Sequence, residues 1–386
     1  MHILHVTTFL QGGAGRAIAA LALAQRRAGH EVLVVLDDGA EAGYGTYPEY
    51  LDALAAGGVS LLTVASTFRR ALDLNTSAAV RIAEAIAARA IDIAHAHAAI
   101  PSMVARLALG ARAVPIVQTM HGWGIAKSAE HTRTDVELLN LIDFVVTPSA
   151  AAKSTLRRLG VTSSITVTPY GIEDRGGDRD ADVLTSIDPA DRARFDMLRG
   201  SGLPIVLCIG TIGARKNQRL LTEAMAVPTA PRFNAVFIGD GEEDALRAEA
   251  RERGVADRVH VLGYRRDASR YLALGDLLVL PSRNEGLPLA VLEAFRDGVP
   301  VVASAIPEIA EAIQHGETGY LFESESPAAL AAALTEALGA GDDRVGLMRQ
   351  RTMENFRARY TLDRMVSDYD RLYAALRTRS VQALAG

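Results

Sequence analysis

The sequence is short of several features that would each indicate a class of protein. One cysteine, Cys208, among 386 residues excludes an intrachain disulfide and is typical of a reducing compartment. Aromatic residues make up 5% of the chain, too few for the stacking platforms of a single-strand-binding protein. Neither charge sign dominates, because 41 basic residues accompany 46 acidic ones. This balance argues against a nucleic-acid partner.

Long hydrophobic runs are also missing. No stretch reaches the ~18 uninterrupted apolar residues that a membrane-spanning helix needs. The opening MHILHVTTF has no basic segment, so we expect no signal peptide. We therefore expect a cytoplasmic protein, with peripheral contact at the inner face of the membrane left open. Apolar residues still make up 49% of the chain, enough for the cores of two domains.

What the chain does contain is a repeating order of short apolar runs and alanine-rich amphipathic stretches. This order predicts an α/β protein with buried parallel sheets and helices on both faces. We expect strands at 3–6, 32–36, 60–64, 91–95, 116–120, 144–147 and 164–167, then at 205–209, 235–238, 259–262, 277–280 and 301–303. We expect helices at 17–28, 76–89, 102–109, 135–141, 149–159, 217–225, 242–253, 268–273, 289–295 and within 342–383.

The pattern lapses between these two series. Residues 173–182 (EDRGGDRDAD) are charged and have no apolar period, which is typical of a linker or surface excursion. We expect two tandem Rossmann-like doubly wound domains, at 1–175 and 200–360, and a helical tail at 361–386. Ligands of open α/β sheets bind beyond the carboxyl ends of the strands, so we expect both domains to face a central cleft.

Two strand-to-helix loops are suited to phosphate. The first, residues 11–16 (QGGAGR), has glycines that allow close backbone approach, and it precedes a helix N-terminus. A tight turn without a ligand is the alternative. The second loop ends in Arg215 and Lys216, and Lys216 is one of only three lysines in the chain. Two cations at a helix start can bind diphosphate oxygens, or they can be ordinary solvated charges.

Carboxylates and histidines supply further candidates. Glu285 lies in a loop and Glu293 in the helix after it, where both could bind sugar hydroxyls or simply be surface residues. His95 and His97 alternate at a strand end, but no third ligand with suitable spacing is evident, so we expect no metal site. His121 closes another strand, where either a site residue or a structural histidine would fit.

Taken together and in order, nine stretches resemble glycosyltransferase family 4, whose members are retaining, nucleotide-sugar-dependent enzymes of the GT-B fold. The stretches are GGAGRAIAALALAQRRAGHEVLVV, IDIAHAH, TMHGWG, TPYGIE, IGTIGARKNQRLLTEAM, FIGDGEEDALRAEA, VLGYRRD, LLVLPSRNEGLPLAVLEAFRDGVPVVAS and HGETGYLF. They cover nearly the whole chain. Tyr170 and Gly171 stand where the family usually has Asn-Gly, which is one of several departures from its pattern.

The resemblance implies roles for individual residues. Gly13, with Gly15 in the same loop, would meet the donor diphosphate, whose growing charge Arg215 and Lys216 would neutralise without a metal. Glu285, the stretch from Gly286 to Leu289, and His121 would hold the donor sugar. The implied catalytic residues are Glu285, His121, Arg215 and Lys216. The implied substrate-binding residues are Gly13, Gly15, Tyr264 and Arg265 (near the base), Gly286, Leu287, Leu289 and Glu293 (on the ribose).

The implied reaction is transfer of a hexosyl unit, with retention, from a nucleotide-diphosphate sugar to an acceptor hydroxyl. We expect a UDP-sugar ahead of a GDP-sugar, and no cofactor. The acceptor would be a small molecule, a lipid-linked sugar or a glycan, as in polysaccharide biosynthesis, and it would meet the N-terminal loops 39–50, 67–75 and 122–133. The alternatives are a GT-B-type nucleotide-sugar epimerase or phosphorylase-like enzyme, and a non-catalytic sugar-nucleotide-binding partner. A Rossmann oxidoreductase, with Asp37 on the ribose, lacks its glycine fingerprint.

Overall fold

The computed structural model describes residues 1–39, 45–124, 127–175 and 185–385. Parts of the expected linker at 173–182 and of the acceptor loops at 39–50 and 122–133 lie outside the described residues. The chain divides into two compact units. Unit 1 is Met1–Gly171 with Leu362–Gly386, and unit 2 is Ile172–Thr361.

Unit 1 contains a seven-stranded parallel sheet in the order β3-β2-β1-β4-β5-β6-β7. Its strands are β1 (His2–Val6), β2 (Glu31–Asp37), β3 (Ser60–Val64), β4 (Ile93–Ala96), β5 (Ile116–Thr119), β6 (Phe144–Thr147) and β7 (Ile165–Val167). Its helices are α1 (Gly12–Arg27), α2 (Pro48–Ala56), α3 (Leu72–Ala85), α4 (Ala99–Leu109), α5 (Ala129–Asn140), α6 (Ala150–Arg158) and α15 (Leu362–Ala385).

The side-chain alternation along β2 explains why helices cover both faces of this sheet. Val32, Val34 and Leu36 belong to a core with α1 and α2. Leu33 and Val35 point the other way, into a core with α3 and α4. Both sets are buried, so a continuous apolar run is needed, and strands of this kind occur in parallel sheets with two covered faces.

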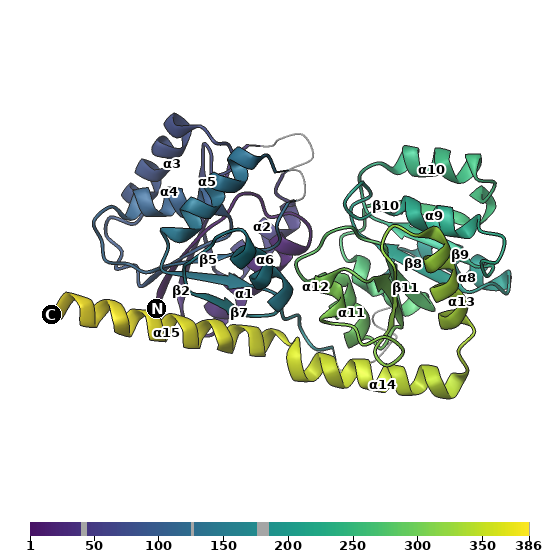
Figure 1. Cartoon of the computed structure of the whole chain (residues 1–386). Coiled ribbons are helices and arrows are strands. Elements are labelled where there is room, and N and C mark those ends of the chain that lie inside the picture. Colours follow the sequence, from purple (N-terminus) through teal and green to yellow (C-terminus); the bar gives the residue numbers. More distant parts are fainter. Residues whose placement is uncertain (40–44, 125–126, 176–184, 386) are drawn as a thin grey trace. The chain divides into compact units, whose positions relative to one another are not determined.

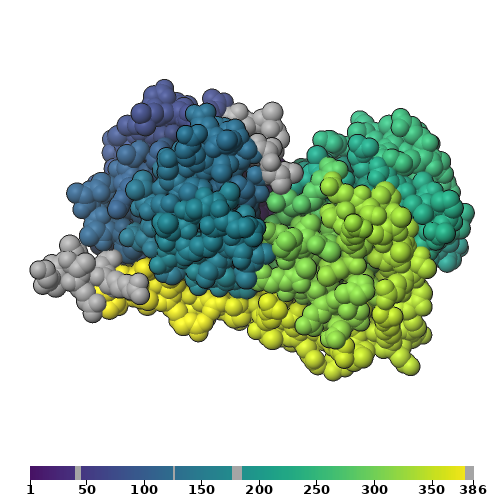
Figure 2. Space-filling view, viewed as in Figure 1, coloured from purple at the N-terminus to yellow at the C-terminus, as the bar shows by residue number. Residues whose placement is uncertain are grey.

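The last helix, α15, belongs to unit 1, although the chain passes into unit 2 after Gly171 and returns only at Leu362. It is the yellow helix that runs along unit 1 in Figures 1 and 2. Its Tyr369 and Tyr373 side chains are buried. Their hydroxyls lie 2.8 Å from Thr119 Oγ1 on β5 and 2.6 Å from His95 Nδ1 on β4, respectively. The expected helical tail is therefore part of the unit 1 core.

Unit 2 contains a six-stranded parallel sheet in the order β10-β9-β8-β11-β12-β13. Its strands are β8 (Ile205–Ile209), β9 (Asn234–Ile238), β10 (Val259–Gly263), β11 (Leu277–Leu280), β12 (Val301–Ser304) and β13 (Tyr320–Phe322). Its helices are α8 (Pro189–Gly200), α9 (Arg219–Met225), α10 (Glu243–Glu252), α11 (Leu289–Arg296), α12 (Pro307–Ala310), α13 (Pro327–Leu338) and α14 (Asp342–Arg359), with 3-10 turns η1 (Ala256–Arg258) and η2 (Ala268–Leu274).

The two doubly wound parallel sheets confirm the expected α/β architecture, and all twelve predicted strands are present. Strand β13 and the helices α2, α8, α12 and α13 were not predicted from the sequence. Within the described part of the chain, no helix is long and apolar enough to cross a membrane.

Candidate active site

Two cations and one carboxylate meet at the carboxyl end of the unit 2 sheet. Lys216 Nζ lies 2.7 Å from Glu285 Oε1, and Arg215 Nη1 lies 3.3 Å from Glu285 Oε2. Arg215 also donates a 3.3 Å hydrogen bond to Asn284 O. Glu285 and Lys216 are largely buried, whereas 50% of the Arg215 side chain is exposed. Residues predicted from two separate loops, after β8 and β11, therefore form one cluster.

The charges of this cluster do not cancel. Burial alone would raise the pKa of Glu285, because the carboxylate loses water. Lys216 and Arg215 oppose that effect and hold the pKa of Glu285 below its usual range. Glu285 is therefore ionised at neutral pH, and the three groups carry a net positive charge. A positive cluster beyond the carboxyl ends of parallel strands is suited to an anionic ligand.

Close backbone packing shapes the loop that carries the two cations. A Cβ on Gly239 would lie 2.2 Å from Gly210 O, and a Cβ on Gly241 would lie 2.2 Å from Ile212 O. Both glycines also have positive φ, at 153° and 118°. The loops after β8 and β9 thus approach at a distance that only glycine allows. This packing fixes the backbone from which Arg215 projects.

Gln218 holds the same loop from the other side, and the sequence analysis missed it. Its side-chain oxygen accepts from Gly213 N at 3.1 Å, and its nitrogen donates to Thr211 O at 3.0 Å. Helix α9 begins only at Arg219. Arg215 and Lys216 therefore lie in the loop before the helix, as expected, and the helix begins two residues later than the predicted start at 217.

The second predicted glutamate lies where the sequence analysis expected it. Glu293 is buried within α11, which begins at Leu289 after Pro288 at the N-cap position. Glu285 belongs to the preceding loop, as predicted. The other residues expected to hold the donor sugar are also buried there: Gly286, Leu287 and Leu289.

Arg265, expected near the base of a nucleotide, is held by an acidic partner. It donates to both carboxylate oxygens of Asp191, at 2.6 and 3.1 Å, and Tyr271 donates to the same carboxylate at 2.6 Å. Burial alone would raise the pKa of Asp191, but Arg265 and Tyr271 lower it. Arg265 thus ties the loop after β10 to α8, and the neighbouring Tyr264 remains 41% exposed.

In unit 1, the glycine-rich loop forms the first turn of α1. A Cβ on Gly15 would lie 2.5 Å from the carbonyl carbon of Leu10, and Gly12 has a φ of 54°, so both positions require glycine. Gly13 is exposed within this first turn, where backbone N–H groups have no partner inside the helix. A helix N-terminus of this kind is suited to an anion, and anion binding at this loop stays a prediction.

Asp37, the ribose-binding residue of the oxidoreductase alternative, has a structural role. Its carboxylate accepts from the backbone N–H groups of Gly39, Thr67 and Phe68 at 2.8 to 3.1 Å. These bonds anchor the loop after β3 and occupy both carboxylate oxygens. The oxidoreductase alternative loses its one supporting residue.

Two of the loops expected to meet an acceptor are joined by another buried carboxylate. Asp135 on α5 pairs with Arg70 and with Lys127, whose Nζ lies 2.5 Å from Asp135 Oδ2. Lys127 Nζ also lies 3.9 Å from the centre of the Trp123 ring. The loops at 67–75 and 122–133 are therefore held together, with two partly exposed cations at their junction.

His121 lies at the end of a group of buried histidines that the sequence analysis only partly found. Its Nδ1 lies 2.5 Å from Tyr170 Oη, and its Nε2 lies 3.1 Å from His97 Nδ1. His5 on β1 joins His95 and His97, with ligand atoms within 4.8 Å of one another. The sheet order β3-β2-β1-β4 brings His5 opposite His95, and spacing along the sequence could not reveal this. Both ring nitrogens of each of these three histidines already have hydrogen-bonding neighbours, so a metal ion would have to displace them.

Comparison with known proteins gives the family. The family model described as "Glycosyl transferases group 1" matches residues 203–340, and the one described as "Glycosyltransferase Family 4" matches residues 11–175. A D-inositol 3-phosphate glycosyltransferase of Acidothermus cellulolyticus is 30% identical over 322 residues, which are 76% of this chain and 70% of that protein. This chain belongs to glycosyltransferase family 4.

Other relatives agree with that membership. The N-acetyl-alpha-D-glucosaminyl L-malate synthase of Bacillus anthracis is 27% identical over 76% of this chain and 77% of its own length. The crystal structure of Anabaena HepE in complex with UDP superposes with a TM-score of 0.79 at 19% identity, over 97% of this chain and all of HepE. A Rickettsia africae glycosyltransferase gives a TM-score of 0.80 at 18% identity, over 97% of this chain and 98% of its own. The fold of this glycosyltransferase is thus GT-B.

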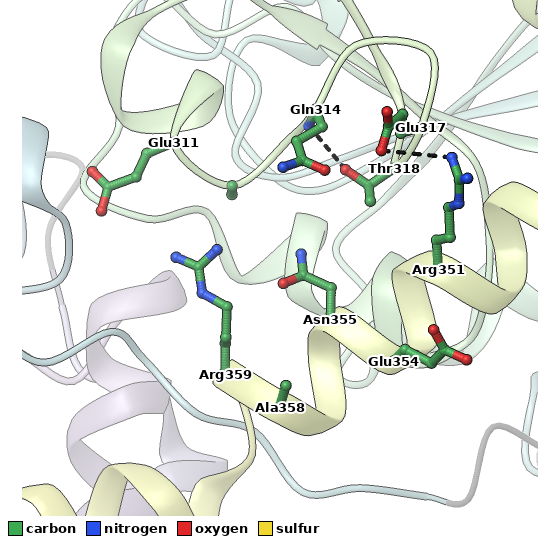
Figure 3. Close-up of a pocket in the computed structure, with 10 residues that line it drawn as sticks. Glu311, Gln314, Glu317, Thr318, Arg351, Glu354, Asn355, Ala358 and Arg359 are labelled. Carbon is green, nitrogen blue, oxygen red and sulfur yellow. Dashed lines mark hydrogen bonds and ion pairs between the residues drawn. The ribbon is translucent and has the colours of Figure 1, made fainter.

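The glycosyltransferase also has a cavity of 470 Å³ in unit 2, with a lining of its own. It is bounded by the segment that follows α12 and by α14 (Figure 3). Glu317 pairs with Arg351 on its rim at 3.5 Å, and Gln314 N donates to Thr318 Oγ1 at 2.9 Å. None of the site residues predicted from the sequence lines it.

Proposed function

We propose that this glycosyltransferase transfers a hexosyl unit from a nucleotide-diphosphate sugar to an acceptor hydroxyl, with retention at the anomeric carbon and without a metal ion. The observation that carries the proposal is the positive cluster of Arg215, Lys216 and Glu285. A diphosphate leaving group gains negative charge as its bond to the sugar breaks, and preorganised cations stabilise that charge. Arg215 and Lys216 would thereby supply what a divalent ion supplies in metal-dependent enzymes.

Each of the remaining residues would contact a different part of the donor. The backbone N–H groups near Gly13, with Gly15 beside them, would meet the diphosphate. Glu293 would accept hydrogen bonds from the ribose, and Tyr264 and Arg265 would border the base. Glu285, with Gly286, Leu287 and Leu289, would hold the sugar hydroxyls, and His121 would lie beside the donor sugar.

The proposed step balances without a protein nucleophile. The acceptor oxygen forms the new bond on the face from which the diphosphate departs, and the bond between the anomeric carbon and the diphosphate oxygen breaks. The leaving β-phosphate oxygen takes the acceptor proton. The transition state resembles an oxocarbenium ion, so electrostatic support is the main requirement of the site.

The comparisons support a choice of donor. HepE was crystallised with UDP and with UDP-glucose, and we propose a UDP-sugar for this chain, ahead of a GDP-sugar. Its reaction would take place in the cytoplasm, consistent with the single buried thiol of Cys208.

The acceptor is proposed from the relatives and from unit 1. One relative is named for inositol 3-phosphate, another for L-malate, and others for lipopolysaccharide core synthesis. Each of the first two names a small anionic compound. The cations Arg70 and Lys127 at the loop junction could meet such an acceptor, or the anionic group of a lipid-linked or glycan acceptor.

Product analysis tests this proposal directly. The protein is incubated with UDP-glucose and other UDP-hexoses and with inositol 3-phosphate, malate and lipopolysaccharide core acceptors, in the presence and absence of EDTA. We expect a product with the anomeric configuration of the donor, formed equally with EDTA. An inverted product contradicts the mechanism, and loss of activity in EDTA contradicts metal independence. A new nucleotide sugar formed without any acceptor would favour the epimerase.

A further inference from the structure

A line of hydrogen bonds crosses the unit 1 sheet from α1 to the segment after β7. Gln25 Oε1 lies 2.8 Å from His5 Nε2, and His5 Nδ1 lies 3.0 Å from His97 Nε2. His97 Nδ1 lies 3.1 Å from His121 Nε2, and His121 Nδ1 lies 2.5 Å from Tyr170 Oη. The four rings from His5 to Tyr170 are stacked one on the next, with centroids 5.3 to 5.7 Å apart. Each imidazole therefore makes two hydrogen bonds in the line, one through Nδ1 and one through Nε2.

The histidines in this line are neutral. Burial lowers the pKa of His5 and of His121 to about 4, because the charged imidazolium loses water. Burial, together with the neighbouring histidines, lowers the pKa of His97 well below its usual value. A neutral imidazole has one N–H donor and one acceptor nitrogen. Each ring must therefore donate to one neighbour and accept from the other.

This requirement links the tautomers of the whole line. Gln25 Oε1 accepts, so His5 carries its proton on Nε2 and accepts at Nδ1. His97 then donates from Nε2 and accepts at Nδ1, so His121 in turn donates from Nε2. Tyr170 donates its hydroxyl proton to His121 Nδ1. Every donor in the line has an acceptor in this order, and reversing one ring would leave two N–H groups or two lone pairs facing each other.

The Gln25 amide also orders a second branch through α15. Its nitrogen donates to Tyr373 Oη at 3.4 Å, and that oxygen lies 2.6 Å from His95 Nδ1. Tyr373 thus donates to His95, whose Nε2–H donates to Thr119 Oγ1 at 2.7 Å. The amide of Gln25 presents its oxygen to one branch and its nitrogen to the other. A single orientation of this amide therefore sets the direction of the hydrogen bonds in both branches.

We propose that Gln25 is a positioning residue that selects the tautomer of His121 through His5 and His97, with Tyr170 holding the far end. This rests on the proposed function in one respect, the placement of His121 beside the donor sugar. An Nε2-protonated ring there keeps a lone pair on Nδ1 toward Tyr170 and a fixed plane against the substrate. Both nitrogens of His121 are engaged by His97 and Tyr170, so its tautomer decides which neighbour it donates to and how the ring is held in place.

The substitution Gln25→Leu tests the proposal. It leaves His5 Nε2 against an apolar side chain, and a buried N–H without a partner is more costly than a buried lone pair. His5 should therefore move its proton to Nδ1, and the line should reverse ring by ring. His121 then becomes protonated on Nδ1 and donates to Tyr170 Oη, whose own O–H turns away from the ring. Long-range 1H–15N spectra of the full-length protein with labelled histidine distinguish the two tautomers. Substitution of each histidine in turn assigns the signals.

Two further variants complete the test. Gln118→Leu removes another buried glutamine of unit 1, one that bonds Ser102 and stands outside the line, and should leave the His121 tautomer unchanged. Tyr170→Phe removes the hydroxyl at the far end and should leave His121 protonated on Nε2, because Gln25 still sets the order. An unchanged His121 tautomer in Gln25→Leu, or a reversed one in Tyr170→Phe, would overturn the proposal.

Kinetics give a second readout. Gln25→Leu should lower kcat about tenfold, the effect of one misdirected hydrogen bond, with KM for the donor little changed, whereas Gln118→Leu should retain wild-type kcat. Equal kcat in Gln25→Leu and wild type would overturn the positioning role. The spectra need no substrate, so failure of sugar transfer by the wild-type protein would count against the proposed function alone.

Discussion

Lys216 and Glu285 are 69 residues apart in the chain, yet Lys216 Nζ lies 2.7 Å from Glu285 Oε1. They come from loops after β8 and β11, which are neighbours in the unit 2 sheet. The contact pairs a residue proposed to bind diphosphate with one proposed to bind sugar. In the donor complex, Lys216 would contact both the diphosphate and Glu285. Substituting Glu285 alone would therefore separate its proposed role in sugar binding from the proposed role of Lys216 in diphosphate binding.

Glu285→Gln is expected to reduce turnover and to spare nucleotide binding. The amide loses the charge that strengthens hydrogen bonds to sugar hydroxyls, which should lower kcat by about 10- to 100-fold. The same change leaves Arg215 and Lys216 with no anionic partner in the cluster, so the nucleoside diphosphate should bind at least as tightly as before. Steady-state kinetics and calorimetric titration with the diphosphate measure the two effects.

A matched control for that variant is Glu249→Gln. Glu249 is also a buried glutamate of unit 2 and pairs with Arg219 and Arg253, outside the candidate site. Its substitution should leave kcat near the wild-type value. Unchanged turnover in Glu285→Gln, or an equal loss in Glu249→Gln, contradicts the role assigned to Glu285.

Gly15→Ala is expected to destabilise unit 1. The added Cβ would lie 2.5 Å from the carbonyl carbon of Leu10, and backbone atoms would have to move. Overpacking of this kind costs about 1–3 kcal/mol. Gly346→Ala serves as the control, because Gly346 lies within α14 with open space around its Cβ position, and alanine there should stabilise by about 0.5–1 kcal/mol. Thermal unfolding measures both, and a Gly15→Ala variant as stable as wild type would show that the loop needs no glycine at that position.

Unit 1 is expected to lose stability as the pH falls from 6.5 towards 4. In the folded state the pKa of His5 and of His121 is lowered to about 4 by burial, whereas in the unfolded chain both keep a pKa near 6.5. Between these values the unfolded chain binds protons that the folded unit does not. The stabilisation is therefore complete above pH 6.5 and declines at about 1.4 kcal/mol per pH unit for each histidine.

Urea unfolding at pH 7 and pH 5 measures this effect. Trp123, the single tryptophan, lies in unit 1 and reports on that unit by fluorescence. Removing one titrating group in His121→Asn should make the pH dependence shallower, and His131→Gln, on an exposed surface of α5, should not change it. Equal stability of wild-type unit 1 at pH 7 and pH 5 would contradict the neutral, buried state of the histidines.

Much of the architecture could be predicted because it depends on local pattern. Continuous apolar runs such as Ile205–Ile209 mark buried parallel strands, and the predicted bounds of that strand match β8. The loop position of Glu285 and the helical position of Glu293 likewise follow from Pro288, which favours a helix start. Helix α8 was missed although Asp188 and Pro189 form a recognisable start signal, and the Asp188 carboxylate does cap it.

What could not be predicted depends on contacts between distant segments. No local pattern pairs Arg265 with Asp191, brings His5 beside His97, or carries Tyr373 of α15 into the unit 1 core. Strand order determines these contacts, because neighbours in a doubly wound sheet are often far apart in the chain. The candidate residues were therefore found singly, and only the structure shows how they are held.

Thermal unfolding with a panel of UDP, GDP, ADP, TDP and CMP tests the central claim most directly, applied to wild type and to Lys216→Met. A ligand that binds only the folded state raises the melting temperature, and the stabilisation grows with the logarithm of its concentration relative to its Kd. We expect one nucleoside diphosphate, UDP, to raise the melting temperature of the wild-type protein, and Lys216→Met to lose most of that shift. No shift from any nucleotide at millimolar concentration, or an equal shift in the variant, would contradict a diphosphate site at Arg215 and Lys216.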